Sequence, residues 1–124
     1  MRIVVAPASP RTGRATIEAL LQDALSPTVT GVYRDKSKVP AEFTSNPCFE
    51  AVQGNVGDAD SLDFGEADVV VTISPPHYSG KPDPITAART NAENVLKAVR
   101  NSESIKRLVY VSSVGAEHES GTVR

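Results

Sequence analysis

A short turn near the amino terminus gathers side chains suited to holding an anion. Residues 6–13 read Ala-Pro-Ala-Ser-Pro-Arg-Thr-Gly and lie between an apolar run and a helical stripe. Ser9, Arg11 and Thr12 offer two hydroxyls, a guanidinium and backbone N–H groups at a helix N-terminus, which carries a partial positive charge. Folds that bind dinucleotides place glycines here as G-x-G-x-x-G or G-x-x-G-x-x-G, but only the last, Gly13, is present. Pro7 and Pro10 take the other two spacings, so the turn predicts either a phosphate site with fewer donors or a plain proline-rich turn.

A second cationic cluster follows the next predicted strand. Arg34 comes 21 residues after Gly13, with Lys36 and Lys38 close by. Folds selective for NAD place an acid near this position, whereas a guanidinium suits the 2′-phosphate of NADP. Asp35 would repel a phosphate if it turned inward, and solvated loop charges are the alternative interpretation.

Acid–base chemistry has weaker support. A Y-x-x-x-K pair would let a tyrosine transfer a proton while the lysine lowers its pKa. The positions four residues after the three tyrosines are Ser37, Pro82 and Val114, so this pair is absent. The remaining catalytic candidates are weak: His77 and Tyr78 in a loop, and Ser112 and Ser113 at a strand end. Cys48 reads as a packing residue and His118 as solvent-exposed.

Strands that alternate with helices must position these residues. Continuous apolar or β-branched runs predict five strands, at Ile3–Ala6, Val29–Tyr33, Phe49–Gln53, Asp68–Ile73 and Arg107–Ser112. A helix stopped by Ser26-Pro27 is predicted from the stripe Ile17, Leu20, Leu21, Ala24 and Leu25. Asp83-Pro84 predicts the start of a second helix, with the stripe Ile85, Ala88, Ala92, Val95, Leu96 and Val99.

The segments that connect these strands and helices have weaker sequence patterns. Residues 34–47 predict an irregular loop, and residues 58–63 a helical turn capped by Asp58. The alternation of elements predicts one α/β domain over residues 1–124, with right-handed crossovers. We expect a Rossmann-like parallel sheet of about five strands in the order 3-2-1-4-5, flanked by helices.

Composition narrows the class of protein. Thirteen basic residues against fifteen acidic ones give a net charge of −2, which argues against a nucleic-acid binder. No apolar run approaches the ~20 residues that span a bilayer, so no membrane association is expected. A single cysteine and two histidines argue against a disulfide or a metal site, and fit the cytoplasm.

Segments spread over nearly the whole chain are similar to one known family. They are Arg11-Thr12-Gly13-Arg14, Val32-Tyr33-Arg34-Asp35, Val52-Gln53-Gly54-Asn55-Val56, Asn94-Val95-Leu96-Lys97-Ala98 and residues 106–116, KRLVYVSSVGA. In this order they resemble the N-terminal half of an NmrA-like, atypical short-chain dehydrogenase/reductase. The last segment is the most specific of the five.

The resemblance implies a Rossmann-like fold that binds NADP(H) in preference to NAD(H). Ser9 to Thr12 would face the pyrophosphate, and Arg34, aided by Lys38, the 2′-phosphate. Asn55 and Val56 would contact adenine. The ribose and nicotinamide would lie beside Ile73, Ser74, Pro75 and Ser112. The chain departs from the family in its two missing glycines, in Asn55 where an Asp is usual, and in stopping about where the substrate-binding part would begin.

Three functions therefore stay open. The first is the NADP(H)-binding domain of an oxidoreductase that transfers hydride to an unknown small carbonyl or enone. The second is a non-enzymatic module that senses NADP(H) or binds a protein. The third is a degenerate fragment that binds no nucleotide. The last strand, including residues 108–111, is apolar and would form the sheet's outer edge, which predicts a homodimer through this strand or a truncated chain.

Overall fold

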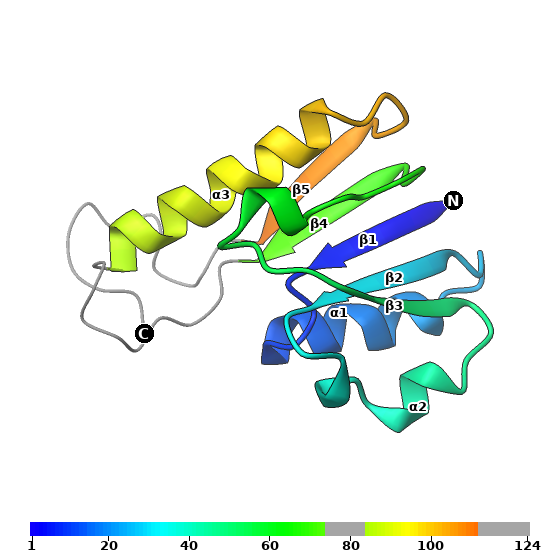
Figure 1. Cartoon of the computed structure of the whole chain (residues 1–124). Coiled ribbons are helices and arrows are strands. Elements are labelled where there is room, and N and C mark those ends of the chain that lie inside the picture. The colour runs from blue at the N-terminus through cyan, green and yellow to red at the C-terminus, as the bar shows by residue number, and fades with distance from the viewer. Residues whose placement is uncertain (74–83, 112–124) are drawn as a thin grey trace.

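A single sheet with helices on both faces forms the framework of the molecule (Figure 1). The computed structural model describes residues 1–73 and 84–111, apart from the side chains of Pro84, Ile85, Ala87 and Ala88. The strands are β1 (Arg2–Ala6), β2 (Thr28–Tyr33), β3 (Phe49–Gln53), β4 (Val69–Ile73) and β5 (Arg107–Val111). Each lies within a residue or two of a predicted strand, because short β-branched runs suit a sheet that is buried on both faces.

All strand pairs are parallel, and the sheet order is β3-β2-β1-β4-β5. The predicted order is therefore confirmed. The central strand β1 pairs Val4 with Thr30 of β2 on one side and with Val70 of β4 on the other. Because every strand runs the same way, all five carboxyl ends meet at one edge of the sheet.

The helices divide the core into two layers. The helices α1 (Arg11–Leu21) and α2 (Ala41–Thr44) cover one face of the sheet, where Ile3, Val5 and Ile17 are buried. The helix α3 (Pro84–Arg100) covers the other face, where Val4, Ala6 and Val95 are buried. Alternate residues of β1 thus serve opposite layers, as strand geometry requires. In the described part of the chain, no helix is long and apolar enough to span a bilayer.

The first helix ends earlier than its apolar stripe predicts. It stops at Leu21, and the chain then turns, with the N–H of Leu25 donating to the Asp23 carboxylate at 2.8 Å. The Leu25 side chain is 87% exposed, so it does not extend the buried stripe. The prediction that Ser26-Pro27 ends the helix was wrong, because the local turn at Asp23 satisfies the backbone before the proline is reached.

The stretch predicted as an irregular loop contains two short helical elements. These are the 3-10 helix η1 (Lys36–Lys38) and α2. The Phe43 side chain is only 3% exposed and packs against Phe49, with the ring centroids 5.4 Å apart. Burial of one aromatic side chain explains why this polar segment is helical, and a long-range contact of that kind leaves no periodic signal in four residues.

The predicted starts of two helical segments agree with the structure, whereas the apolar stripe predicted for the second of them is wrong at one residue. Asp58 caps the 3-10 helix η2 (Ala59–Ser61) by accepting a hydrogen bond from the N–H of Asp60 at 3.1 Å. Pro84 is the first residue of α3, while the predicted cap Asp83 lies outside the described residues. Within α3, Leu96 is 37% exposed and Ala98 is buried in its place, so Leu96 lies at the margin of the packed face.

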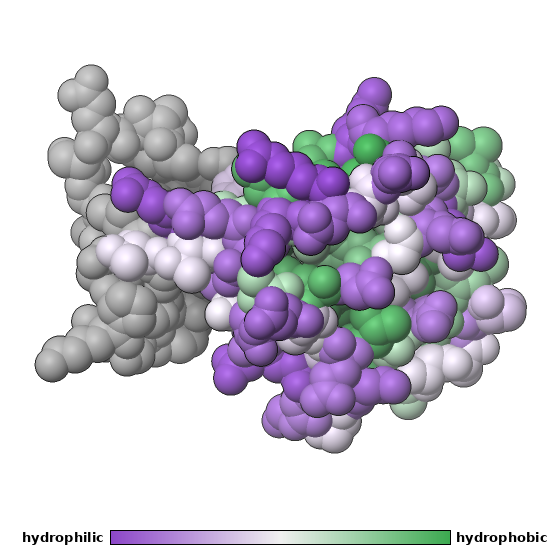
Figure 2. Space-filling view, turned by 45° about the horizontal axis from the view of Figure 1, so that its top comes forward, coloured by the Kyte–Doolittle hydropathy of each residue, from purple (hydrophilic) through white to green (hydrophobic). Residues whose placement is uncertain are grey.

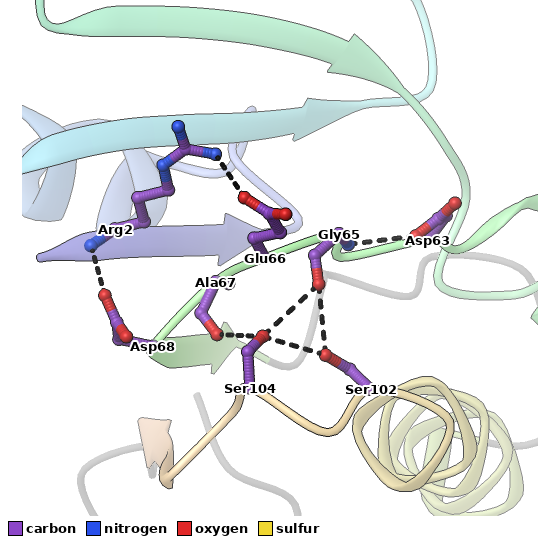
Figure 3. A network of polar contacts seen from close by, with 8 residues as sticks. All are labelled: Arg2, Asp63, Gly65, Glu66, Ala67, Asp68, Ser102 and Ser104. Carbon is purple, nitrogen blue, oxygen red and sulfur yellow. Dashed lines mark hydrogen bonds and ion pairs between the residues drawn. The ribbon is translucent and has the colours of Figure 1, made fainter.

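A polar network fastens the amino-end edge of the sheet (Figure 3). The Ser104 hydroxyl donates to the carbonyl of Ala67 at 2.8 Å, and the Ser102 hydroxyl donates to the carbonyl of Gly65 at 3.0 Å. The backbone N–H of Arg2 donates to the Asp68 carboxylate at 2.8 Å. These contacts join β1, the approach to β4 and the link between α3 and β5, and so they fix the sheet far from the carboxyl ends.

Candidate functional site

The turn after β1 brings α1 very close to the sheet. The N–H of Ala8 donates to the carbonyl of Val32 in β2 at 2.9 Å. A Cβ on Gly13 would lie 2.8 Å from the carbonyl oxygens of both Pro7 and Ala8. Only glycine fits there without moving the backbone, so Gly13 has the close-packing role of the last glycine in a dinucleotide-binding turn.

A second glycine supports this turn and was missed by the sequence reasoning. Gly31 lies in the middle of β2, and a Cβ there would come within 2.7 Å of the Tyr33 ring and 3.1 Å of the Ala8 side chain. A glycine inside a β-branched strand is itself a signal of close approach by other atoms. Here it makes room for the Tyr33 ring and for the turn that carries Ser9.

The N-terminus of α1 leaves backbone donors available. Pro10 is the N-cap residue, no side chain caps the helix, and the first helical hydrogen bond runs from the N–H of Arg14 to the carbonyl of Pro10. The N–H groups of Arg11, Thr12 and Gly13 therefore have no partner within the helix. Ser9, Arg11 and Thr12 lie at this end of the helix, and all three are exposed. Pro10 removes one donor from the turn, yet it leaves the helix start intact.

Contacts between α1 and its surroundings hold this helix end in place. The Arg14 guanidinium bonds to the Glu42 carboxylate of α2 at 2.6 Å and to Glu18 at 3.3 Å. Beneath them the Tyr33 side chain is 1% exposed, and its hydroxyl has no hydrogen-bond partner among the described residues. Burial raises the pKa of the Tyr33 phenol, and the nearby Arg14 charge opposes that rise.

The end of β2 presents the predicted cationic group. Arg34 follows β2 directly and is exposed, and its carbonyl accepts a hydrogen bond from the Gln53 amide at 3.4 Å. None of the described carboxylates lies within ion-pair distance of its guanidinium. Arg34 is thus anchored to β3 through its backbone while its side chain has no competing carboxylate in the described part of the chain.

Asp35 is held in a local cap. Its carboxylate accepts hydrogen bonds from the Ser37 N–H at 2.9 Å and from the Ser37 hydroxyl at 2.7 Å, which starts η1. The Ser37 side-chain bond is the main cause that lowers the pKa of Asp35, followed by the Ser37 backbone bond. The sequence alone left open whether Asp35 opposes a phosphate beside Arg34, and the structure shows it occupied with Ser37. The exposed Lys38 lies at the end of the same short helix.

The loop after β3 is tied to itself and to α3. The Asn55 side-chain oxygen accepts from the Gly57 N–H at 2.8 Å, and the Asn94 amide of α3 donates to the Val56 carbonyl at 2.9 Å. Asn55 is half-buried, and the Val56 side chain is 4% exposed within the core under α3. The N–H of Gly54 donates to the carbonyl of Tyr33 at 2.8 Å, so the loop starts beside the end of β2.

The remaining predicted residues belong to the ends of β4 and β5. Ile73 is the last residue of β4 and is buried. Ser74, Pro75, His77, Tyr78, Ser112, Ser113 and His118 lie outside the described residues. Within the described ranges, no three acidic, histidine or cysteine side chains come together as a metal site would require. Cys48 is a free, half-buried thiol next to β3.

The described candidates share one edge of the sheet. The turn of Ser9 to Gly13, Arg34, Asn55 and Ile73 each follow or end a different parallel strand, so all lie at the carboxyl edge. The chain leaves β1 toward β2 on one side, whereas β4 pairs with β1 on the other, which creates a switch point beside the N-terminus of α1. Ligands of open parallel sheets bind at this position.

A separate groove has a different character. Its volume is about 390 Å³, and it lies over β1, β2 and β3 on the face that carries Phe64. Val4, Val32 and Val52 line it together with the carboxylates of Glu50 and Glu66. On the face drawn in Figure 2, green apolar surface lies between purple hydrophilic side chains of the described residues. The groove contains neither Arg34 nor the turn before α1, so it is not the predicted site.

The fold and its carboxyl edge define an open α/β domain of the nucleotide-binding class. The chain belongs to the NAD(P)H-binding family, whose model matches residues 8–123. A search of curated proteins finds no match.

Solved structures agree in fold. Triphenylmethane reductase of Citrobacter sp., complexed with NADP(H), has a TM-score of 0.72 at 24% identity and covers 91% of this chain and 38% of its own. A short-chain dehydrogenase/reductase of Veillonella parvula in complex with NADP has a TM-score of 0.67 at 20% identity, covering 92% of this chain and 48% of its own. The oxidoreductase ylbE of Lactococcus lactis has a TM-score of 0.69 at 18% identity, and the match covers 98% of this chain and 54% of its own. The chain therefore spans about half or less of these proteins.

Proposed function

We propose that residues 1–124 form one domain that binds NADP(H) in preference to NAD(H), as part of an NmrA-like, atypical short-chain dehydrogenase/reductase. The observation that carries the preference is Arg34, which follows β2 with no carboxylate competitor among the described residues, while Asp35 is occupied by Ser37. A cation at this strand end favours a 2′-phosphate, and a free acid there would favour an unphosphorylated ribose.

The described residues fit such a cofactor at the carboxyl edge. The uncapped start of α1 leaves the backbone N–H groups of Arg11, Thr12 and Gly13 for the pyrophosphate, beside the side chains of Ser9 and Thr12. Arg34 and Lys38 would hold the 2′-phosphate, and Asn55 and Val56 the adenine. Ile73, Ser74, Pro75 and Ser112 would border the ribose and nicotinamide.

Hydride transfer is the chemistry that a bound nicotinamide supplies. We propose a small carbonyl or enone as the acceptor, with Ser112, Ser113, His77 and Tyr78 as candidates for contact with it. Within residues 1–124 none of the three tyrosines has a lysine four positions later, which favours a second function, a module that senses NADP(H) or binds a protein without reducing a substrate. The single cysteine supports a reducing cytoplasmic location for either function.

A fluorescence titration of NADPH and NADH tests the cofactor proposal. Arg34→Ala should weaken NADPH binding about 10- to 100-fold, because a hydrogen-bonded phosphate contact contributes roughly 1.5–3 kcal/mol. NADH binding should stay the same. Arg100→Ala is the matched control. It removes the same charge at the last residue of α3, away from the end of β2, and should change neither affinity.

The possible outcomes separate the three functions. Equal affinity for NADPH and NADH, or an Arg34→Ala variant with unchanged NADPH affinity, would refute the proposed preference. Absence of binding at millimolar cofactor would favour the fragment that binds no nucleotide. Oxidation of bound NADPH by quinones, enones or aldehydes would support the reductase, and binding without oxidation would support the sensing module.

A further inference from the structure

The Ser37 side chain makes a second hydrogen bond to a carboxylate that the backbone already holds. One oxygen of Asp35, Oδ1, accepts both from the Ser37 N–H at 2.9 Å and from the Ser37 hydroxyl at 2.7 Å. The hydroxyl contact is the shorter of the two, and it is the largest cause of the lowered pKa of Asp35. The hydroxyl therefore acts on the ionised carboxylate, which it stabilises and holds in one orientation.

The turn at this point does not require the hydroxyl. Three other aspartates among the described residues accept a hydrogen bond from the backbone N–H two residues later, at 2.8–3.1 Å: Asp23, Asp58 and Asp63. None of the donor residues in those turns carries a hydroxyl: they are Leu25, Asp60 and Gly65. The backbone bond alone is thus enough to cap such a turn. The Ser37 hydroxyl is an addition whose effect falls on the Asp35 carboxylate.

Asp35 lies among cations that a phosphate would use. It follows Arg34 directly, and the exposed Lys36 and Lys38 come after it in η1. A carboxylate released from Ser37 would act against a phosphorylated cofactor in two ways. It would pair with Arg34 or a neighbouring lysine, or it would repel the phosphate as a like charge. For an unphosphorylated ribose the same carboxylate is favourable, because it accepts hydrogen bonds from hydroxyls.

The backbone around Asp35 is held in place, so the orientation of the side chain decides between these effects. Before it, the carbonyl of Arg34 accepts from the Gln53 amide at 3.4 Å. After it, the N–H of Lys38 donates to the Asp35 carbonyl at 3.0 Å, and Val39 packs against the buried core. Removal of one hydroxyl should therefore change the position of the carboxylate and leave the chain path as it is.

We propose that Ser37 is a positioning residue that determines the choice between NADP(H) and NAD(H). Its hydroxyl holds the Asp35 carboxylate at the start of η1 and so keeps the position beside Arg34 open to a 2′-phosphate. The inference rests on the proposed function, and it assigns specificity to a residue that contacts the acid and not the cofactor. Specificity then comes from the removal of a repulsive group as well as from the attractive charge of Arg34.

A double-mutant cycle at Asp35 and Ser37, read by fluorescence titrations of NADPH and NADH, tests the proposal. Ser37→Ala should lower the ratio of NADPH affinity to NADH affinity about 3- to 10-fold, the equivalent of one hydrogen bond. In an Asp35→Asn background the same substitution should leave the ratio unchanged, because the group on which the hydroxyl acts is no longer charged. Ser37→Thr, which keeps the hydroxyl, should retain the parent's ratio.

Ser45→Ala is the matched control for the loss of a hydroxyl. Ser45 is exposed at the end of α2, and its hydroxyl donates to the Glu42 carbonyl at 3.1 Å. This substitution should not change the ratio. A fall in the ratio equal to that of Ser37→Ala would show a general effect of hydroxyl loss and would overturn the proposal.

An NMR titration of the Asp35 carboxylate, in the protein without cofactor, tests the contact itself. Ser37→Ala should raise the pKa of Asp35 toward its usual value, because the main hydrogen bond to the ionised form is lost, and Ser45→Ala should not. An unchanged pKa of Asp35 in Ser37→Ala would show that the hydroxyl does not hold the carboxylate, and it would overturn the proposal.

The titrations separate this inference from the proposed function. If Arg34→Ala abolishes the preference for NADPH but Ser37→Ala leaves the ratio unchanged, the cofactor proposal stands and the role of Ser37 is refuted. An equal fall of the ratio with and without the charge at Asp35 would assign the hydroxyl to direct contact with the cofactor, which also overturns the positioning role. A parent that binds neither nucleotide, or binds both equally, refutes both proposals.

Discussion

Gly13 offers a direct test of how the turn before α1 works. In Gly13→Ala the new Cβ would lie 2.8 Å from two backbone oxygens and 3.0 Å from the Ala8 carbonyl carbon. To reach an ordinary contact of 3.4 Å, α1 must move away by about 0.6 Å. Neither oxygen belongs to a flexible side chain, so the displacement falls on the helix and on Ile17, which is fully buried one turn further along.

The cost follows from these contacts. Overpacking of this kind costs about 1–3 kcal/mol, and the better helix propensity of alanine returns at most about 1 kcal/mol. We therefore expect the free energy of unfolding to fall by about 1–2 kcal/mol, which lowers Tm by about 4–8 °C in a domain of this size. The displaced N–H donors should also weaken NADPH binding about tenfold, the equivalent of one hydrogen bond to a charged group.

Gly65→Ala separates local displacement from general destabilisation. Gly65 has a φ of +57°, and no atom lies within 4 Å of the position its Cβ would take. Alanine there should cost about 1–2 kcal/mol through the left-handed backbone alone. It lies at the opposite edge of the sheet, so NADPH affinity should not change. Thermal unfolding and NADPH titration of both variants provide the assay. A Gly13→Ala protein with the parent's Tm and NADPH affinity would refute the reasoning.

Two further predictions concern stability. Tyr33→Phe should raise the free energy of unfolding at pH 7 by about 1 kcal/mol, because it removes a buried hydroxyl with no partner among the described residues. Burial raises the pKa of Tyr33 in the folded state above its usual value of 10.0. Ionisation of this phenol therefore leaves the free energy of unfolding unchanged well below pH 10.0, and it lowers that free energy as the pH rises from there through the folded pKa. Urea unfolding between pH 7 and 11 should therefore show a smaller alkaline loss in Tyr33→Phe, and a larger loss would contradict this. Ser104→Ala should cost about 0.5–1.5 kcal/mol by leaving the Ala67 carbonyl without its side-chain donor, and faster amide exchange near β4 would report it.

The sheet could be predicted from the sequence because each strand is a local signal. Short runs such as residues 69–73 are apolar throughout, and their alternation with helices restricts the topology to parallel crossovers. The missed elements depend on distant contacts. α2 exists because Phe43 is buried against the core, and α1 ends at Leu21 because Asp23 captures the backbone of Leu25.

A site residue could be predicted from the sequence where only one amino acid can fill its position. Gly13 could be found because only a glycine allows the helix to pack on the turn. Gly31 was missed because its role depends on Ala8 and Tyr33, which the sequence does not place beside it. The occupation of Asp35 by Ser37 is a choice of side-chain rotamer, and residue order does not determine it. The roles of Asn55, Val56 and the residues after β4 and β5 stay predictions.

The location of the cofactor can be measured residue by residue. Addition of NADP⁺ to ¹⁵N-labelled protein should perturb most strongly the amides of Ser9, Arg11, Thr12, Gly13 and Arg34, and NAD⁺ should perturb the same turn while leaving Arg34 nearly unchanged. Shifts confined to the other edge of the sheet, near Arg2 and Glu66, or no shifts at millimolar NADP⁺, would contradict the account.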